Sequence, residues 1–479
     1  MIPMTGEPTS TENELPADGV DTTEVNTDRE GETDLRTAFV PTFGKYFPES
    51  LVGALLLAVL AMVATVPELE PTTQLELLGG GFYVYDLFAL HMLLLLYWIL
   101  SASAVESPRV GAAFDRLAAS LPTSQAGVIY ATATVSLALG WLNWALGLIG
   151  GILLGQRLCR RARESGTAVH YPSVLTGGLL ALVVANQGPS SPGALIAADD
   201  TGLANFMVDD VGTIGMSEFL LHPANLAPTI LFVLTLPLLL VWLAPDDDGE
   251  IEPLEDRDRI LEGSISETFD HYAPVRDPVD WEPGDRLENA ESLTWIVVAI
   301  GIASLGWHFG TGGALTLPWL AFGLVVVGLA VQGPPMAFRE KTEDATRWAN
   351  HMAIPFLLYA ATFALLTEAA LYAPLGDALA ATGLPYVGSY VAAFALGLLV
   401  PDPGSLWLLQ GPAVAAAGID GVPALVATMY GAGVSNLWLA FLFASVLSIY
   451  GFDWREFATY AAVVTAYVSV VVIGLLLIF

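Results

Sequence analysis

The chain has 479 residues, of which 54% are hydrophobic and only 14% are charged. So few charged side chains cannot cover a soluble protein of this length, and the composition predicts an integral membrane protein. Asp and Glu number 49 against 17 Lys and Arg, and the net charge of −32 argues against nucleic acid or anionic lipid as a partner.

Lysine and cysteine are both rare in this chain. Lys45 and Lys341 are its only lysines; this preference for Arg, together with the acid load, is typical of haloarchaeal proteins, which work in molar salt that screens self-repulsion. The single cysteine, Cys159, excludes an internal disulfide, and its position beside Arg160 predicts an inert thiol in a loop. No histidines stand at metal-ligand spacing, so we expect neither a metal nor a cofactor.

Acidic residues concentrate in two stretches that divide the chain. Residues 1–49 hold 11 acids and 3 bases, and residues 245–294 hold 17 acids and 4 bases. Neither stretch has an apolar period, and the first lacks the cationic start and apolar run of a signal peptide. We predict a disordered tail at 1–49, a first transmembrane half at 50–244, a hydrophilic linker at 245–292 and a second transmembrane half at 293–479.

Apolar runs of about 20 residues are long enough to cross a bilayer. In the first half they are Ser50–Val66, Phe82–Ala104, Ala126–Gln156, Pro172–Ala198 and Asn225–Leu243. In the second half they are Leu293–Phe309, Leu317–Val331, His351–Leu371, Tyr386–Val400, Gly404–Ile419, Pro423–Ile449 and Phe457–Phe479. The run Ala126–Gln156 is too long for one crossing and contains Asn143 followed by Gly147, so it predicts a hairpin or a broken helix.

Basic residues indicate on which side of the membrane a loop lies, because cytoplasmic loops carry an excess of Lys and Arg. Arg157 to Arg163 form the densest basic cluster, and Arg339 to Arg347 mark a second cytoplasmic loop. The loop from Arg109 to Arg116 falls on the same side by its charge. That placement conflicts with two halves of strictly inverted orientation.

One polar interruption rich in Pro and Gly lies inside the apolar sequence of each half. The first, Asn186–Gly193, has Ser191 before a Pro-Gly pair, and the second, Pro401–Ser405, has Asp402 before another. A capping residue followed by Pro is the order found where a helix begins, so both indicate helix starts at membrane depth. Pro-kinked helices with only a packing role are the alternative.

Broken backbone at membrane depth needs partners, because each unpaired N–H or C=O group in hydrocarbon costs several kcal/mol. Two helix N-termini that meet near the midplane could therefore bind a small anion through their N–H groups, without Arg or Lys. Paired interruptions in two halves also point to a secondary transporter that exposes its site alternately to each side.

Five short segments carry a resemblance to a known family. They are Gly79–Phe82; Asn143-Trp144 with Gly147; Tyr171-Pro172 leading to Gly188 and Ser190; Val400-Pro401 through Gly404, Trp407 and Gln410-Gly411-Pro412; and Tyr430-Gly431 with Asn436. Over roughly residues 41–479 the chain resembles the short-chain fatty acid transporter family, the acetoacetate/butyrate type of permease. The resemblance implies a carrier with re-entrant hairpins that moves short monocarboxylates across the cytoplasmic membrane.

Three segments depart from the pattern of that family. Gln187–Pro192 stands where the family has a Gly-rich stretch, Asp402–Leu406 replaces a Ser-Gly-Gly-Gly-His run, and Ala432–Val434 replaces Glu-Gln-Trp. The first two departures fall at the expected binding site.

Asp402 would repel an anionic substrate if it were ionised. One hypothesis is that burial keeps it protonated and that it carries a coupled proton; a second is that it contributes to a cation site. A third is that the site has changed and no longer takes monocarboxylates. The structural alternative is a helix cap at a loop end exposed to water.

We predict a multi-pass, all-α membrane protein of two related halves, each giving one interrupted or re-entrant helix to a central carboxylate site. The expected substrate-binding residues are Asn143, Trp144, Gln187, Gly188, Ser190, Ser191, Gly404, Ser405, Trp407, Gln410 and Asn436. Asp402 is the candidate for coupling to a proton or sodium gradient. The alternatives are a passive anion channel and a carrier for a different small organic anion. A homo-oligomer stays open, and no nucleophile or ligand cluster supports an enzyme.

Overall fold

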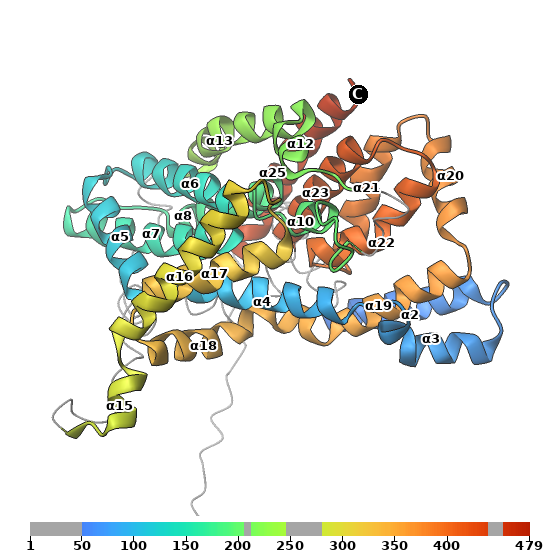
Figure 1. Ribbon diagram of the computed structural model, residues 1–479. Coiled ribbons are helices and arrows are strands. Elements are labelled where there is room, and N and C mark those ends of the chain that lie inside the picture. The colour runs from blue at the N-terminus through green and yellow to red at the C-terminus, as the bar shows by residue number, and fades with distance from the viewer. Residues whose placement is uncertain (1–49, 206–211, 246–279, 439–453) are drawn as a thin grey trace, which may run out of the picture.

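The computed structural model describes residues 50–205, 212–245, 280–438 and 454–479. In these ranges every regular element is a helix, which confirms the predicted all-α class (Figure 1). Six helical stretches are long and apolar enough to cross a membrane, so the polytopic architecture is confirmed as well. The predicted tail, most of the linker and the end of the span Pro423–Ile449 lie outside the described residues.

The helices before the linker include a series of long elements, then several short ones, and one more long element at the end. They are α2 (Ser50–Thr65), α3 (Pro71–Val84), α4 (Phe88–Val105), α5 (Pro108–Ser120), α6 (Gln125–Leu142), α7 (Trp144–Glu164), α8 (Tyr171–Leu179), α9 (Ala181–Val184), the 3-10 turn η1 (Ala185–Gln187), α10 (Pro192–Ala197), α12 (Met216–Leu221) and α13 (Pro223–Leu243).

The helices that follow the linker begin with one short piece inside it. They are α15 (Pro283–Glu288), α16 (Glu291–Gly310), α17 (Leu317–Gln332), α18 (Pro335–Ala353), α19 (Pro355–Glu368), α20 (Tyr372–Ala381), α21 (Pro385–Gly397), α22 (Pro403–Ala416), α23 (Gly421–Trp438) and α25 (Trp454–Leu476). Pro stands in the first turn of most of them, where its missing N–H leaves no hydrogen bond unmade.

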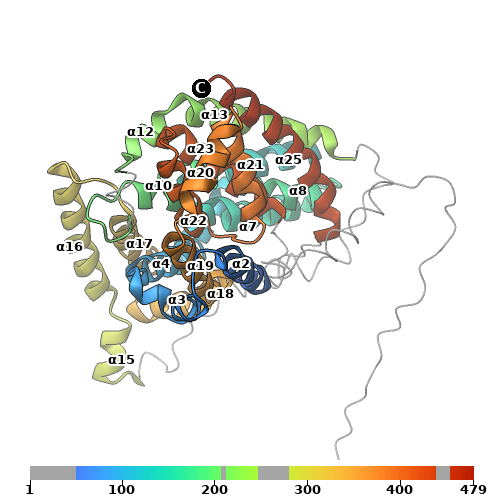
Figure 2. The same ribbon diagram turned by 90° about the vertical axis from the view of Figure 1, so that its right-hand side faces the viewer.

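Helix α4 joins the two parts of the chain. It packs against α7 of the first half and against α17 and α18 of the second. In Figure 1, α4, α19, α2 and α3 run along one side of the molecule, with α13, α25 and α21 to α23 on the other. Figure 2 shows α16 at the outer edge beside α17, with α15 beyond it. Segments from both halves come together within one of these layers, where α19 packs against α2 and α3.

Helices α6 and α7 form the hairpin that was predicted within Ala126–Gln156. The chain reverses at Asn143, whose backbone is extended, and the two helices then pack along their length. Gly140 and Gly147 face one another so closely that a Cβ at Gly147 would overlap the backbone of Gly140. Small residues are needed at this crossing, because any larger side chain would separate the two helices.

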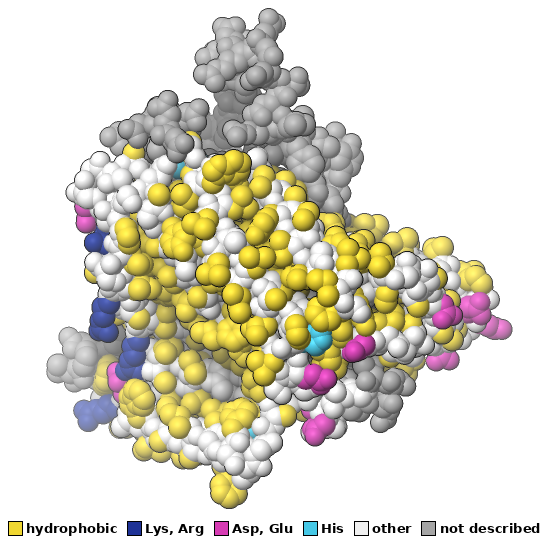
Figure 3. Space-filling view, turned by 90° about the horizontal axis from the view of Figure 1, so that it is seen from above, with side chains coloured by type: hydrophobic (Ala, Val, Ile, Leu, Met, Phe, Trp, Pro, Cys, Tyr) yellow, Lys and Arg dark blue, Asp and Glu magenta, His cyan; other side chains and the backbone are white. Residues whose placement is uncertain are grey.

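The face of the molecule seen in Figure 3 is broadly apolar, and its charges lie near the edges. On α16, for example, Trp295, Ile300 and Trp307 are largely exposed. Helices of this composition without a covering partner face lipid in a membrane protein. In Figure 3 the Lys and Arg side chains lie along one edge and most Asp and Glu side chains lie toward the opposite edge.

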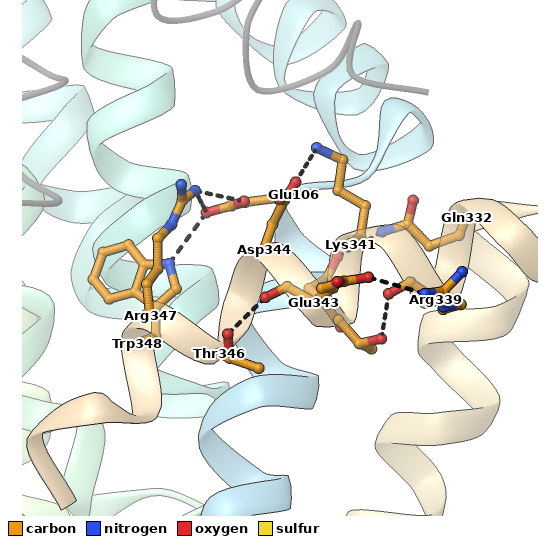
Figure 4. Close-up of polar contacts among 11 residues, drawn as sticks. Glu106, Gln332, Arg339, Lys341, Glu343, Asp344, Thr346, Arg347 and Trp348 are labelled. Carbon is orange, nitrogen blue, oxygen red and sulfur yellow. Dashed lines mark hydrogen bonds and ion pairs between the residues drawn. The ribbon is translucent and has the colours of Figure 1, made fainter. Parts of the chain in front are cut away.

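The basic loops of both halves lie at the same end of the molecule. The Glu106 carboxylate, which is almost fully buried at the end of α4, accepts hydrogen bonds from Arg347 at 3.2 Å and from the Trp348 indole at 3.2 Å (Figure 4). Arg109 donates to the Ala330 carbonyl at the end of α17. Contacts thus join the end of α4 to α18 and the start of α5 to the end of α17. The inverted orientation of the two halves stays a prediction.

Three expectations from the sequence are wrong in detail. The run Phe82–Ala104 is not one helix, because the chain turns between α3 and α4 with Asp86 at a φ of 50°. The run His351–Leu371 is broken at Ile354, and its first residues end the amphipathic helix α18, which carries Arg and Glu on one face. Cys159 is fully buried inside α7 and not in a loop.

Replacing Glu106 with Gln tests the buried ion pair that joins α4 to α18. Arg347 is 39% exposed and keeps part of its hydration, so we expect a loss of about 1–2 kcal/mol in the free energy of unfolding, less than for a fully buried pair. Thermal unfolding in detergent measures it. Glu343→Gln removes the exposed pair with Arg339 as a matched control, and equal shifts in the two variants would contradict this assignment.

Candidate functional site

Three buried helix starts lie inside the apolar runs of the sequence, and each has a side-chain cap. The Asn143 side chain accepts from the Ala145 N–H at 2.9 Å at the start of α7. Ser191 accepts from the Ala194 N–H at 3.4 Å at the start of α10. Asp402 accepts from the Ser405 N–H at 2.6 Å at the start of α22. The two starts predicted at Ser191 and Asp402 are confirmed, and Asn143 adds a third.

The breaks before these three helices meet around the middle of α4. Trp98 of α4 donates from its indole N–H to Asp402 at 3.1 Å, and its ring contacts that of Trp144, with 4.2 Å between centroids. Ser101, almost one turn further on, accepts from the Asn143 amide at 3.0 Å. Tyr97, also of α4, lies beside Ser190. Residues more than 200 positions apart thus surround one segment.

Direct contacts also join the breaks to one another. A Cβ at Gly188 would overlap the carbonyl oxygen of Trp141, so the first break lies against the tip of the α6–α7 hairpin. Helix α10 packs on α22, where Gly193 faces the side chain of Trp407 and Gly404 faces Ile196. The sequence-based expectation that the two interruptions converge is therefore confirmed.

Asp402 is fully buried, so the alternative of a cap exposed to water is wrong. Its carboxylate accepts from Trp98 and from the backbone of Gly404 and Ser405. Among the described residues, Asp402 forms no ion pair. Within this part of the chain, a negative charge on Asp402 would be balanced by dipoles, including that of the N-terminal end of α22.

The N-terminus of α22 does not offer free N–H groups in this state. Pro403 has none, the N–H groups of Gly404 and Ser405 point to the Asp402 carboxylate, and the N–H of Leu406 bonds to the Asp402 carbonyl at 2.9 Å. The expectation that two open helix ends bind the substrate is therefore wrong for α22. Helix α10, with six residues, has a short dipole of its own.

The place where the breaks at Asn143, Ser191 and Asp402 meet around α4 is called the junction here. Unused hydrogen-bonding atoms lie at this junction. Both side-chain atoms of Gln187, at the end of η1, lack a partner among the described residues, and the side chain is fully buried. The indole N–H of Trp144, at the first residue of α7, lacks one too. Helix α7 contacts η1, which brings the two elements together. Buried polar atoms without partners are costly, so these are the atoms available to a ligand.

The remaining predicted site residues divide into a near and a far group. Ser405 and Trp407 are buried in the first two turns of α22, close to the second break. Gln410 lies further along α22 and donates to the Ser389 carbonyl of α21 at 2.9 Å, which leaves its side-chain oxygen without a partner in the described part of the chain. Asn436 lies near the end of α23, and no contact places it at the junction.

Sequence reasoning missed the residues of α4 that organise the site. Tyr97 and Trp98 stand in an apolar run that gives no sign of an unusual role. The only available signal is the pair of serines Ser101 and Ser103 inside a span. No group of three or more His, Cys, Asp or Glu side chains that could hold a metal ion occurs among the described residues.

Comparison with known proteins agrees with the resemblance seen in the sequence. The family model described as Short chain fatty acid transporter matches residues 33–479. A provisionally named short-chain fatty acid transporter of Escherichia coli (strain K12) is 24% identical over 447 residues, which cover 90% of this chain and 97% of the relative. A Haemophilus influenzae protein with the same provisional name is 24% identical over 456 residues, 91% of this chain and 98% of that relative. The chain thus belongs to the short chain fatty acid transporter family and is a multi-pass membrane transport protein, not an enzyme.

Proposed function

We propose that this protein is a secondary carrier that moves short-chain monocarboxylates, such as butyrate or acetoacetate, across the cytoplasmic membrane together with a proton. The observation that carries the proposal is the junction around α4, where a buried carboxylate without a paired cation lies among breaks from both halves. Family membership supports the substrate class. The basic end of the molecule, with Arg157 and Arg347, supports a cytoplasmic position for that end.

The proposed site binds the substrate carboxylate through side-chain donors. Gln187 and Trp144 supply N–H groups that have no other partner among the described residues, and a carboxylate can accept from both. The facing rings of Trp98 and Trp144 supply an apolar wall for a short alkyl chain. A site of this kind suits one carboxylate and a short tail, because it contains one small set of donors and no Arg or Lys.

Asp402 is the proposed proton carrier. An ionised carboxylate that is buried without a cation is costly, and the cost falls when the group binds a proton. Its oxygens face N–H donors, an arrangement that leaves a sodium ion few ligands there. The proton neutralises the group that caps α22, and the positive end of that helix then attracts the incoming anion. Carboxylate and proton are released together on the other side.

Uptake of labelled butyrate into proteoliposomes tests this function. A proton gradient should drive accumulation, and a sodium gradient at equal pH on both sides should not. A dicarboxylate such as succinate should not be accumulated under either condition. Conductance that is independent of the proton gradient would indicate a passive channel instead, and accumulation driven by sodium alone would contradict the coupling proposed for Asp402.

Changes at Gln187 test the proposed carboxylate contact. We expect Gln187→Ala to raise the KM for butyrate about tenfold, the effect of one lost hydrogen bond of about 1.5 kcal/mol to a charged group. Gln187→Glu places a negative charge beside the substrate and should nearly abolish uptake. Gln125→Ala is the control, because that amide bonds to the Pro245 carbonyl away from the junction. Uptake kinetics that are unchanged in both Gln187 variants would remove this residue from the site.

A further inference from the structure

In both halves, the helical segment that leads into a break ends on a carbonyl group held by a different helix. The Gln187 carbonyl, at the end of η1, accepts from the side-chain amide of Asn225 in α13 at 3.1 Å. The Leu399 carbonyl, just after α21, accepts from the Tyr359 hydroxyl in α19 at 3.0 Å. Carbonyls at a helix end have no partner within the helix, so these two side chains complete the broken ends.

A buried network fixes the orientation of Asn225. Its amide nitrogen also donates to the Phe219 carbonyl at 3.0 Å, and its amide oxygen accepts from the Thr229 hydroxyl at 3.3 Å. The Tyr430 hydroxyl of α23 donates to the Asn225 carbonyl at 3.0 Å and lies 2.8 Å from the Thr229 hydroxyl. Asn225, Thr229 and Tyr430 are all buried. With both ends of its amide engaged, Asn225 has one orientation available to it.

This network bears directly on the unused side chain at the first break. Gln187 has its carbonyl held by Asn225, while both polar atoms of its side chain lack partners among the described residues. The backbone fixes the direction of the Cα–Cβ bond, so the bond to the carbonyl limits the positions that the side-chain amide of Gln187 can reach. Fixing donors before a ligand arrives increases affinity, because less ordering remains to be done on binding.

We propose that Asn225, held by Thr229 and Tyr430, and Tyr359 are positioning residues for the substrate site, acting through the carbonyl ends of the two broken helices. The inference rests on the proposed function. It assigns the affinity of the site in part to side chains that do not touch the substrate. Their loss loosens the breaks and weakens binding more than it changes the rate of the loaded carrier.

Isosteric replacements test this assignment without creating cavities. Thr229→Val removes the hydroxyl that holds Asn225, Thr229→Ser retains it, and Tyr359→Phe removes the donor to Leu399. We expect Thr229→Val and Tyr359→Phe each to raise the KM for butyrate about fivefold in proteoliposomes, with a maximal rate within about twofold of wild type. Thr229→Ser should restore a KM near that of wild type.

The matched control lies on the same helix. Thr235 of α13 pairs with the Tyr467 hydroxyl of α25 at 2.7 Å, the same chemistry outside the junction. Thr235→Val should leave the KM unchanged. A KM in Thr229→Val equal to that in Thr235→Val would overturn the proposal.

A second readout does not depend on transport. Hydrogen–deuterium exchange of peptides covering residues 185–192 should be faster in Thr229→Val than in wild type and unchanged in Thr235→Val. If butyrate is not transported by any form but this difference is seen, the proposed function fails and the positioning stands. Exchange equal in the two Val variants contradicts the positioning whatever the substrate is.

Discussion

Replacing Asp402 with Asn is expected to uncouple uptake from the proton gradient. Asn has one acceptor oxygen, which can cap α22 as the Asp402 carboxylate does, and it gives up the second oxygen, which accepts from the Trp98 indole. The start of α22 should therefore persist with the loss of that one hydrogen bond. It cannot exchange a proton in this pH range. A gradient of one pH unit is worth about 1.4 kcal/mol, or tenfold accumulation for one proton per substrate. The variant should no longer concentrate butyrate and should at most equalise its concentration on the two sides of the membrane.

The measurement is the steady-state ratio of butyrate inside and outside proteoliposomes at several imposed pH differences. Wild type should accumulate more substrate as the external pH falls below the internal pH, because the external side then loads protons. The profile of Asp402→Asn should be flat. Asp420→Asn is the control, since this carboxylate lies in the turn before α23 and bonds to the Val422 N–H. A sloping profile in Asp402→Asn would remove it from the coupling step.

Replacing Gly188 with Ala is expected to separate the first break from the hairpin tip. The added Cβ would overlap the Trp141 carbonyl oxygen, and backbone cannot move aside as the end of a flexible side chain can. Such overpacking costs about 1–3 kcal/mol. Because α7 begins three residues after Trp141, the shift also displaces Trp144. We expect a lower temperature of unfolding together with nearly complete loss of uptake.

Gly323→Ala separates this steric effect from a general effect of adding methyl groups. Gly323 lies inside α17, where a Cβ meets no atom within 4 Å, and Ala is a better helix former than Gly. The control should unfold at the same or a higher temperature. Fluorescence-monitored unfolding in detergent compares the two proteins, and full activity in Gly188→Ala would show that the tip and the break do not need this close contact.

The sequence predicted the breaks because their signals are local. A cap followed by Pro and Gly sets a helix start within four residues, as at Ser191 and Asp402, and the structure has both. The hairpin at Asn143 was predictable from the length of its apolar run. Insertion in the membrane followed from composition, since the balance of apolar and charged residues is a property of the whole chain, and the helical class followed from apolar runs of about 20 residues.

The partners of the breaks could not be predicted, because they depend on which helices meet. Trp98, Asn225 and Tyr359 stand in apolar spans, and their roles arise from carboxylate or carbonyl groups 38 to 304 positions away. The same limit explains why the sequence wrongly predicted free N–H groups at the start of α22. Counting free N–H groups at a helix start assumes that the cap takes one of them, whereas the buried Asp402 takes several.

Protection of a cysteine at Ser190 tests the central claim, that butyrate binds where the breaks meet around α4. Cys159 is fully buried inside α7 and should give a low background. Ser190 is buried as well in this state, so the labelling rate of a cysteine at this position reports how often the carrier opens the site to one side. In Ser190→Cys, butyrate should slow labelling by a small thiol reagent and succinate should not, while Thr311→Cys at the end of α16 should label at the same rate with either. If a transport-active Ser190→Cys protein is labelled at the same rate with and without saturating butyrate, the proposed location of the site is contradicted.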